Sequence, residues 1–235
     1  MIFKTEEKPV VTEVVESDVM HIISFVGQER ADIIFYLAKI LQERNTKEGY
    51  RTVLLIDNSD SKDLFHIVNK EDDYQKTLKR LTFMEDIEWN EEYFKQYAFV
   101  IIYHGMDVDF DILNKSDLVI CQTDYNPNHY MSMKNILSGY TGEIQLIYRD
   151  WFSKKIKESD IEDCMNIPNE QVEMRSYIKF DGDDFMASIQ LMQNGNQRVN
   201  KSNLSGLMIE TLSYLAEKIT GADEKTIEKM IKNAK

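Results

Sequence analysis

The sequence predicts an α/β fold in which a doubly wound, mostly parallel sheet is flanked by helices. Continuous apolar runs recur along the chain, for example at 53–56 and 99–103, as in strands buried on both faces of a parallel sheet. Helical segments lie between these runs, and this alternation is typical of doubly wound sheets. The 235 residues are 43% hydrophobic and 11% aromatic, which suffices for a substantial core and excludes disorder over most of the chain.

The expected strands lie where β-branched and other apolar residues cluster, at 19–26, 52–57, 98–103, 117–122, 144–149 and 175–180. The expected helices lie at 30–44, 61–69, 74–83, 90–96, 128–138, 154–165, 183–193 and 204–219. In the last of these, apolar residues form a stripe that should pack against the sheet. We expect one α/β domain over 19–220, a tail or edge strand at 1–18 and a helical tail at 221–235.

Charge and composition exclude several classes of protein. The chain carries 28 Lys and Arg against 41 Asp and Glu, a net charge of −13, which opposes binding to a nucleic-acid backbone. The apolar runs are far shorter than the roughly 18 residues of a membrane span, and charged residues near the N-terminus interrupt any signal peptide. Cys121 and Cys164 form neither a disulfide framework nor a zinc pattern. We expect a soluble, cytoplasmic protein.

The turn between the first strand and the first helix is the natural anion site of such a fold, because backbone N–H groups and the helix dipole favour negative charge there. Here the turn spans 24–32, and later strands end at Asp57 and Tyr103. This order and spacing resembles the ParA/MinD family of deviant P-loop ATPases, which includes localisation proteins of the CpaE/TadZ and FlhG type. The resemblance covers roughly 19–220 and includes 178–181, which is similar to the family's Ile-Pro-x-Asp strand. It implies a P-loop NTPase-like fold.

Most residues of the family's phosphate loop, Lys-Gly-Gly-x-Gly-Lys-Thr/Ser-Thr/Ser, are absent. Anchored on Leu37 and Ala38, the loop falls on Phe25, Val26, Gly27, Gln28, Glu29, Arg30, Ala31 and Asp32. Phe25 stands at the signature lysine, Val26 replaces a glycine, and only Gly27 is unchanged. Ala31 lacks the hydroxyl that ligates Mg²⁺. The resemblance therefore implies a degenerate nucleotide site.

Two charged replacements bear on phosphate binding. Glu29 puts a carboxylate where backbone must approach phosphate closely. At about 4 Å and an effective dielectric of about 20, that repulsion is about 4 kcal/mol, which weakens a micromolar site to about millimolar. Arg30 stands at the catalytic lysine and could touch a phosphate, but its planar fork does not reproduce an ammonium point charge.

Two further strands end at altered motif positions. Asp57 matches the first aspartate of the family's second motif, but Ser59 stands at the next one. Tyr103 occupies the position of the metal-side aspartate. The run 57–61 also fits a helix N-cap cluster, which we favour over a metal site. If the alignment is wrong, the turn at 24–32 is an ordinary strand–helix connection.

Glu29 and Asp32 suggest how the loop stays ordered without a ligand. Both fall within or beside the first turn of the expected helix 30–44, where carboxylates meet free N–H groups and the positive end of the dipole. We expect them to fill the vacated anion site from within. Exchanging them for Gly and Thr should then lower stability in the absence of ATP.

The resemblance implies a non-catalytic scaffold or localisation protein that binds other proteins, for a cell-envelope assembly such as a pilus, flagellum or secretion system. We expect no cofactor, no nucleic acid, and membrane association only through partners. The partner would be an active ParA/MinD-like protein or a machine ATPase, and a homo- or heterodimer is compatible with this. The alternatives are a residual ATPase that binds ATP and Mg²⁺, and a DNA-partitioning adaptor.

Other residues have plainer interpretations. The run 107–111 imitates the start of a calcium loop but lacks its later glycine and glutamate, so we expect a solvated loop. His104 follows a strand and is the histidine of most interest, although an ordinary loop position is the default. Met131 and Met133 are expected in the core or at its rim. The apolar residues at 227, 230 and 231 indicate a capping helix rather than a membrane-targeting one.

Overall fold

A computed structural model describes residues 20–27, 30–68, 75–151, 157–179, 181, 182, 184, 186–188 and 204–234. Over these residues, eight strands form the main sheet in the order β10-β9-β8-β1-β7-β4-β6-β5. The strands are β1 His21–Gly27, β4 Val53–Asp57, β5 Gln75–Leu78, β6 Leu81–Glu85, β7 Phe99–Gly105, β8 Leu118–Thr123, β9 Ile144–Trp151 and β10 Val172–Lys179. All neighbouring pairs are parallel except β5 and β6. The predicted fold class is confirmed.

Helices connect the strands. They are α1 Asp32–Leu41, α2 Asp63–Val68, α3 Glu91–Phe94, α4 Phe110–Leu113, α5 Pro127–Leu137, α6 Glu158–Met165, α8 Gly206–Thr220 and α9 Glu224–Asn233. A short hairpin, β2 Asn45–Thr46 with β3 Gly49–Tyr50, follows α1, and a 3-10 turn at Asn169–Gln171 precedes β10.

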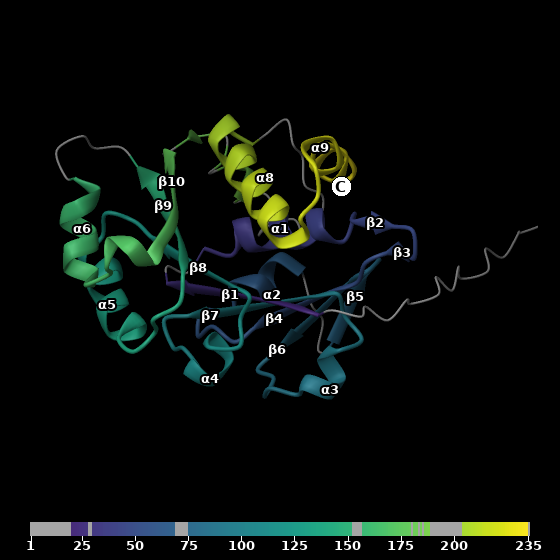
Figure 1. Cartoon of the computed structure of the whole chain (residues 1–235), viewed down its shortest axis with the longest axis horizontal. Helices are drawn as coiled ribbons and strands as arrows, with labels where there is room; N and C mark the ends of the chain where they lie inside the picture. The colour runs from purple at the N-terminus through teal and green to yellow at the C-terminus, as the bar shows by residue number, and fades with distance from the viewer. Residues whose placement is uncertain are drawn as a thin grey trace, which may run out of the picture.

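The sheet lies between two helical layers (Figure 1). One layer contains α1, α2, α8 and α9, and their apolar residues share a core with the sheet. The other contains α3, α4, α5 and α6, over two further clusters. Alternation along β1 assigns the faces: Ile23 and Phe25 join the first core, whereas Ile22 and Val26 join the opposite ones.

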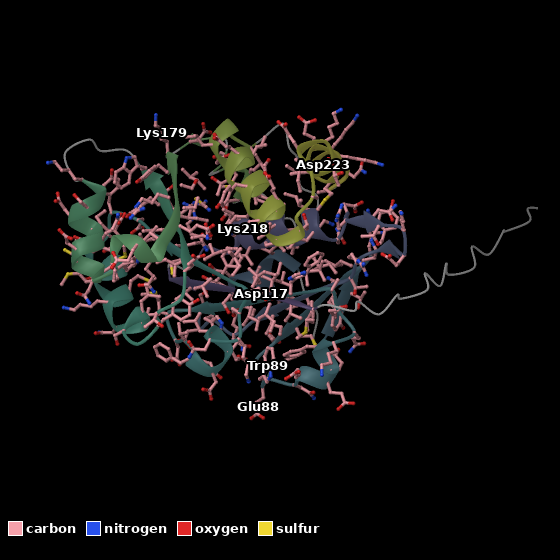
Figure 2. All side chains as sticks on the ribbon, viewed as in Figure 1. Glu88, Trp89, Asp117, Lys179, Lys218 and Asp223 are labelled. Carbon is pink, nitrogen blue, oxygen red and sulfur yellow. The ribbon has the colours of Figure 1, made fainter. Side chains whose placement is uncertain are left out.

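The C-terminal helices close the first layer. Ile227, Met230 and Ile231 of α9 are buried in the core that α1 and α8 form, as expected of a capping helix. Asp223 accepts a hydrogen bond from the Thr226 N–H and so caps α9 (Figure 2). At the edge of the sheet, Lys218 of α8 pairs with Glu173 of β10.

One helix prediction is wrong. The segment expected as a helix at 74–83 contains β5 and β6, which pair antiparallel. Lys79, at the turn between them, has a positive φ of 58°. Leu81 and Phe83 lie two residues apart on the same face and are both fully buried, so packing against the sheet prevails over helical spacing.

Smaller differences concern segment ends and exposure. The expectation for 1–18 lies outside the described residues, as does most of 183–193. The expected loop at 107–111 includes the start of α4, which Asp109 caps by accepting from the N–H groups of Asp111 and Ile112. Met133 is fully buried as expected, whereas Met131 is 59% exposed.

Candidate functional site

Parallel strands end together at one edge of the sheet, which we call the carboxyl edge: the ends of β1, β4, β7, β8 and β9. Asp57 and Tyr103 lie in register on the neighbouring strands β4 and β7, and Phe25 of β1 is in register with Tyr103 on its other side. The sheet therefore brings together the sequence-predicted positions at the ends of β1, β4 and β7. Phe25, Val26 and Tyr103 are fully buried, so their side chains belong to the core.

Gly27 ends β1 at a position that only glycine fits. Its φ is 105°, and an added Cβ would lie 2.1 Å from the Gln122 carbonyl oxygen of β8 and 3.0 Å from the Met133 sulfur. The strand end is thus held directly against β8. Gln28 and Glu29 follow it and lie outside the described residues, so the predicted repulsion by Glu29 stays a prediction.

Arg30 does not lie free in the turn. Its Nη1 donates to Asp150 Oδ2 at 2.5 Å, and its Nη2 lies 3.5 Å from Asp32 Oδ2. The guanidinium at the position of the family's lysine is therefore directed to the end of β9. Ala31, the N-cap residue of α1, is buried and provides no side-chain cap.

Asp32 opens α1 and makes a buried ion pair with Arg149 of β9. Arg149 Nη1 and Nη2 donate to the two carboxylate oxygens at 3.1 and 2.9 Å, and the two residues are 1% and 2% exposed. The Ile33 N–H donates to Asp32 Oδ1 at 2.8 Å. Burial alone would raise the pKa of Asp32, but the Arg149 and Arg30 guanidinium groups offset it and hold that pKa at about 2. The carboxylate is charged and fully engaged.

Asp57 is also engaged locally. Its Oδ1 accepts from the Ser59 N–H at 3.1 Å and from Ser59 Oγ at 2.5 Å, while its Oδ2 accepts from the Leu64 N–H at 3.0 Å. Asp57 is fully buried, and this burial raises its pKa against the opposing effect of the Ser59 hydrogen bonds. These contacts match the predicted capping role.

The expectation of an ordinary loop position for His104 is wrong, because His104 lies in β7 and is buried. The buried polar group that it forms with Ser24 was not predicted. Ser24 Oγ lies 3.0 Å from His104 Nε2 and 2.7 Å from Ser116 Oγ. Ser24 and His104 are at most 1% exposed, so no substrate can reach this pair. Burial lowers the pKa of His104 to about 4, and Asp109 opposes the shift. The arrangement orders β1 against β7 rather than activating a nucleophile.

Aromatic side chains cluster where β8, β9 and β10 end at the carboxyl edge. Tyr125 stacks on Trp151 with ring centroids 4.3 Å apart, and Tyr148 stacks on Tyr177 at 5.1 Å. Trp151 also meets Tyr148 edge-on at 5.3 Å. These residues come from three strand ends separated in sequence, and no spacing in the chain indicates their contact.

Some hydrogen-bonding capacity is left beside this cluster. Within the part of the chain that the structure describes, both amide atoms of Gln122, the Thr123 hydroxyl and Arg149 Nε are buried without a partner. Gln122 is in register with Gly27, so its amide belongs to the residue next to the end of β1. Buried polar atoms without partners favour a small polar ligand or water beside them.

Neither a metal site nor a membrane-spanning helix is found in the described ranges. They contain no group of three or more His, Cys, Asp or Glu side chains placed to hold a metal ion. None of the helices in these ranges is both long and apolar enough to cross a membrane.

Solved structures share the architecture. MinD from Aquifex aeolicus is 14% identical with a TM-score of 0.61, over 86% of this chain and 98% of that one. The MinC:MinD cell division complex of Aquifex aeolicus gives 14% and 0.60, over 86% and 97%. A ParA family ATPase from Chlorobium tepidum TLS gives 14% and 0.55, over 83% and 99%. No family model and no curated protein sequence matches the chain. These similarities establish a ParA/MinD-like P-loop NTPase fold.

Proposed function

We propose that this chain is a non-catalytic ParA/MinD-like protein that acts by binding other proteins. The main support for this proposal is the buried Asp32–Arg149 ion pair at the start of α1. In this fold a helix N-terminus at the carboxyl edge is the place for an anion. Here the chain supplies that anion itself and neutralises it with a cation from β9.

The described residues fit a magnesium triphosphate poorly. Arg30 is paired with Asp150, Asp57 accepts from its own turn, and Ala31 offers no hydroxyl to a metal. Separating a buried ion pair costs about 3–5 kcal/mol. If a nucleotide had to separate the Asp32–Arg149 pair in order to bind, this cost would weaken a micromolar nucleotide site to about millimolar.

Because the site fits a nucleotide poorly, we infer that the chain acts by binding other proteins. A fixed site removes the nucleotide switch, so the interaction surface is presented constitutively or controlled by the partner. MinD from Aquifex aeolicus has been solved with MinC, a complex between a protein of this fold and a different protein. We propose an active ParA/MinD-like protein or a machine ATPase as partner, in a heterodimer or beside a homodimer. The assembly would be a pilus, flagellum or secretion system of the cell envelope.

Isothermal titration with ATP and Mg²⁺ tests the closed site. The proposal predicts no saturable heat at nucleotide concentrations up to about 100 μM, with an active ParA/MinD-like ATPase as the positive control. Saturable binding below that concentration, together with hydrolysis, would establish the residual ATPase instead. The Gln122 amide, which has no partner within the described residues and belongs to the residue in register with Gly27, favours that second function.

Co-purification at native expression level tests the partner. The proposal expects a ParA/MinD-like or machine ATPase to be retained by the wild-type chain, and the interaction to be reproduced with purified components. Salt-sensitive retention on DNA would favour a DNA-partitioning adaptor, which the net charge of −13 opposes.

A further inference from the structure

The helices that connect parallel strands run antiparallel to them, so their C-termini gather at the opposite edge of the sheet, which we call the amino edge. There α5 ends at Leu137 and α6 at Met165, and the two helices pack against each other. A helix C-terminus carries a partial negative charge, because its last carbonyl groups point along the axis without intrahelical partners. Two such ends converge beside the starts of β9 and β10, where N–H groups of the following turns donate to the Leu137, Glu162 and Asp163 carbonyl oxygens and leave their second lone pairs.

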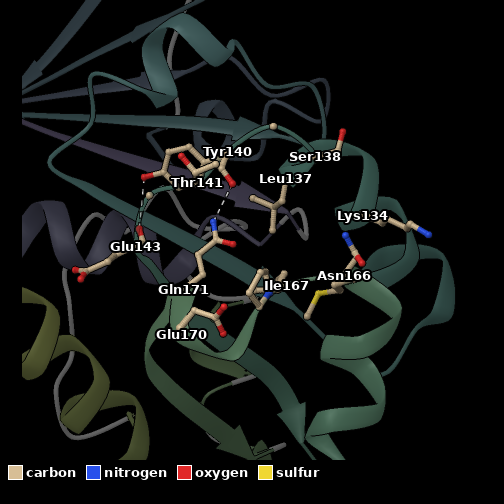
Figure 3. Close-up of a pocket in the computed structure, with 14 residues that line it drawn as sticks. Lys134, Leu137, Ser138, Tyr140, Thr141, Glu143, Asn166, Ile167, Glu170 and Gln171 are labelled. Carbon is tan, nitrogen blue, oxygen red and sulfur yellow. Dashed lines mark hydrogen bonds between the residues drawn. The ribbon is translucent and has the colours of Figure 1, made fainter.

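A cavity of about 390 Å³ lies between these helix ends (Figure 3). The loops 138–143 and 166–171 form its walls. Its apolar lining comes from Leu137, Met165 and Ile167, each at most 7% exposed and part of the core beneath α5 and α6. The volume is within the range of small-ligand sites, and the apolar lining suits an aliphatic group.

The lining of this cavity contains both donors and acceptors, but its two acids, Glu143 and Glu170, outnumber its one cation, Lys134. Gln171 Nε2 donates to the Tyr140 carbonyl oxygen at 3.0 Å, which leaves the amide oxygen of Gln171 on the cavity side (Figure 3). Glu170, an exposed acid, also lines the wall. Lys134 is the one cation among the lining residues, and its ammonium group points away from the cavity in Figure 3.

We propose that this cavity binds a guanidinium or ammonium group carried on an aliphatic stem. The stem packs on Leu137, Met165 and Ile167, and the cation meets Glu170, the Gln171 amide oxygen and the carbonyl ends of α5 and α6. A net charge of −13 adds a long-range attraction for cations. An anion would meet the negative ends of two helices. The source of the cation is an arginine side chain of a protein or a free diamine.

Nuclear magnetic resonance titration of the whole protein tests the site. The probes are N-acetyl-arginine-N-methylamide for the side chain, 1,4-diaminobutane for the free diamine and N-acetyl-norleucine-N-methylamide as the neutral analogue. We expect saturable amide shifts confined to 134–143 and 165–171, with a Kd on the order of 1 mM for the better cation. The cation that binds more tightly identifies the source.

Variants of Glu170 give the decisive control. Glu170→Gln should weaken cation binding about threefold and Glu170→Lys more than about tenfold. Glu88→Gln is the matched control, because Glu88 is exposed and lies near α3 and α4, away from α5 and α6 (Figure 2). It should leave the affinity unchanged.

Three results would overturn the proposal. They are the absence of cation-dependent shifts at about 20 mM, equal affinity for the neutral analogue, and unchanged binding by Glu170→Lys. The inference does not rest on the proposed function, because nucleotide binding at the carboxyl edge would leave these titrations unaffected.

Discussion

The carboxyl and amino edges of the same sheet differ in how they treat charge. At the carboxyl edge, α1 begins with a carboxylate that is buried, doubly hydrogen-bonded to Arg149 and inaccessible. At the amino edge, α5 and α6 end around an open cavity with acceptors on its wall. One alternation of strands and helices creates both edges, since helix N-termini lie at one and C-termini at the other.

The difference shows that a fold supplies partial charges at the helix termini, whereas the side chains decide whether a ligand can use them. At the carboxyl edge the side chains satisfy the helix end internally. At the amino edge they leave room for an external cation. Residues at the carboxyl edge should therefore matter for stability, and those at the amino edge for binding.

The largest expected effect comes from breaking the buried ion pair. Asp32→Asn removes the carboxylate that accepts both hydrogen bonds from the buried Arg149 guanidinium, so the free energy of unfolding should fall by about 3–5 kcal/mol in urea denaturation. The double variant Asp32→Leu with Arg149→Met should recover most of this loss. Asp150→Asn is the control, because the Asp150 side chain is 31% exposed and its pair with Arg30 should contribute less than about 1 kcal/mol. Equal losses for the Asp32 and Asp150 variants would contradict the contrast between buried and exposed pairs.

The next effect is a loss of stability in acid that originates at the carboxyl edge. The pKa of His104 is about 4 in the folded chain because of burial, against about 6.5 when unfolded. Between these values the unfolded chain binds a proton that the folded chain excludes. The contribution of His104 is therefore complete above about pH 6.5 and is lost as pH falls toward 4, on the order of 3 kcal/mol in all. Urea denaturation of wild type and His104→Gln across this range checks it, and the variant should show the shallower dependence.

Alanine substitutions at two glycines, one at each edge, compare directly how tightly the two edges are packed. Gly27 and Gly139 have φ values of 105° and 103°, so alanine carries a similar backbone penalty at each, about 1 kcal/mol. At Gly27 the new Cβ would also meet a backbone oxygen at 2.1 Å, whereas at Gly139 nothing lies within 4 Å. Thermal and urea unfolding should show Gly27→Ala to be about 2 kcal/mol more destabilising than Gly139→Ala. Equal destabilisation would mean that β1 is not held against β8.

The smallest effect is expected at the amino edge. Glu170 is exposed, so Glu170→Gln should change the free energy of unfolding by no more than about 0.5 kcal/mol while it weakens cation binding. A stability loss comparable to that of the Asp32 variant would show that the amino edge is structural as well.

Sequence patterns predicted the framework well and the site only in part. Continuous apolar runs located β1, β4, β7, β8 and β9, because burial on both faces leaves a strong local pattern. The edge strand β10 was also predicted, although only Val172 and Ile178 of its residues are buried. The hairpin of β5 and β6 was missed because its apolar residues are also compatible with helical spacing. The capping role of Asp57 was predictable, since Ser59 and Leu64, which donate to its carboxylate, lie within seven residues. The Asp32–Arg149 pair joins residues 117 positions apart, and only the sheet order brings them together.

A crystal structure grown with magnesium and a non-hydrolysable ATP analogue tests the closed carboxyl edge most directly. We expect Asp32 to keep both hydrogen bonds to Arg149, with no phosphate density on the main-chain amides near Gly27. A triphosphate at those amides, with Arg149 turned away from Asp32, would contradict this expectation.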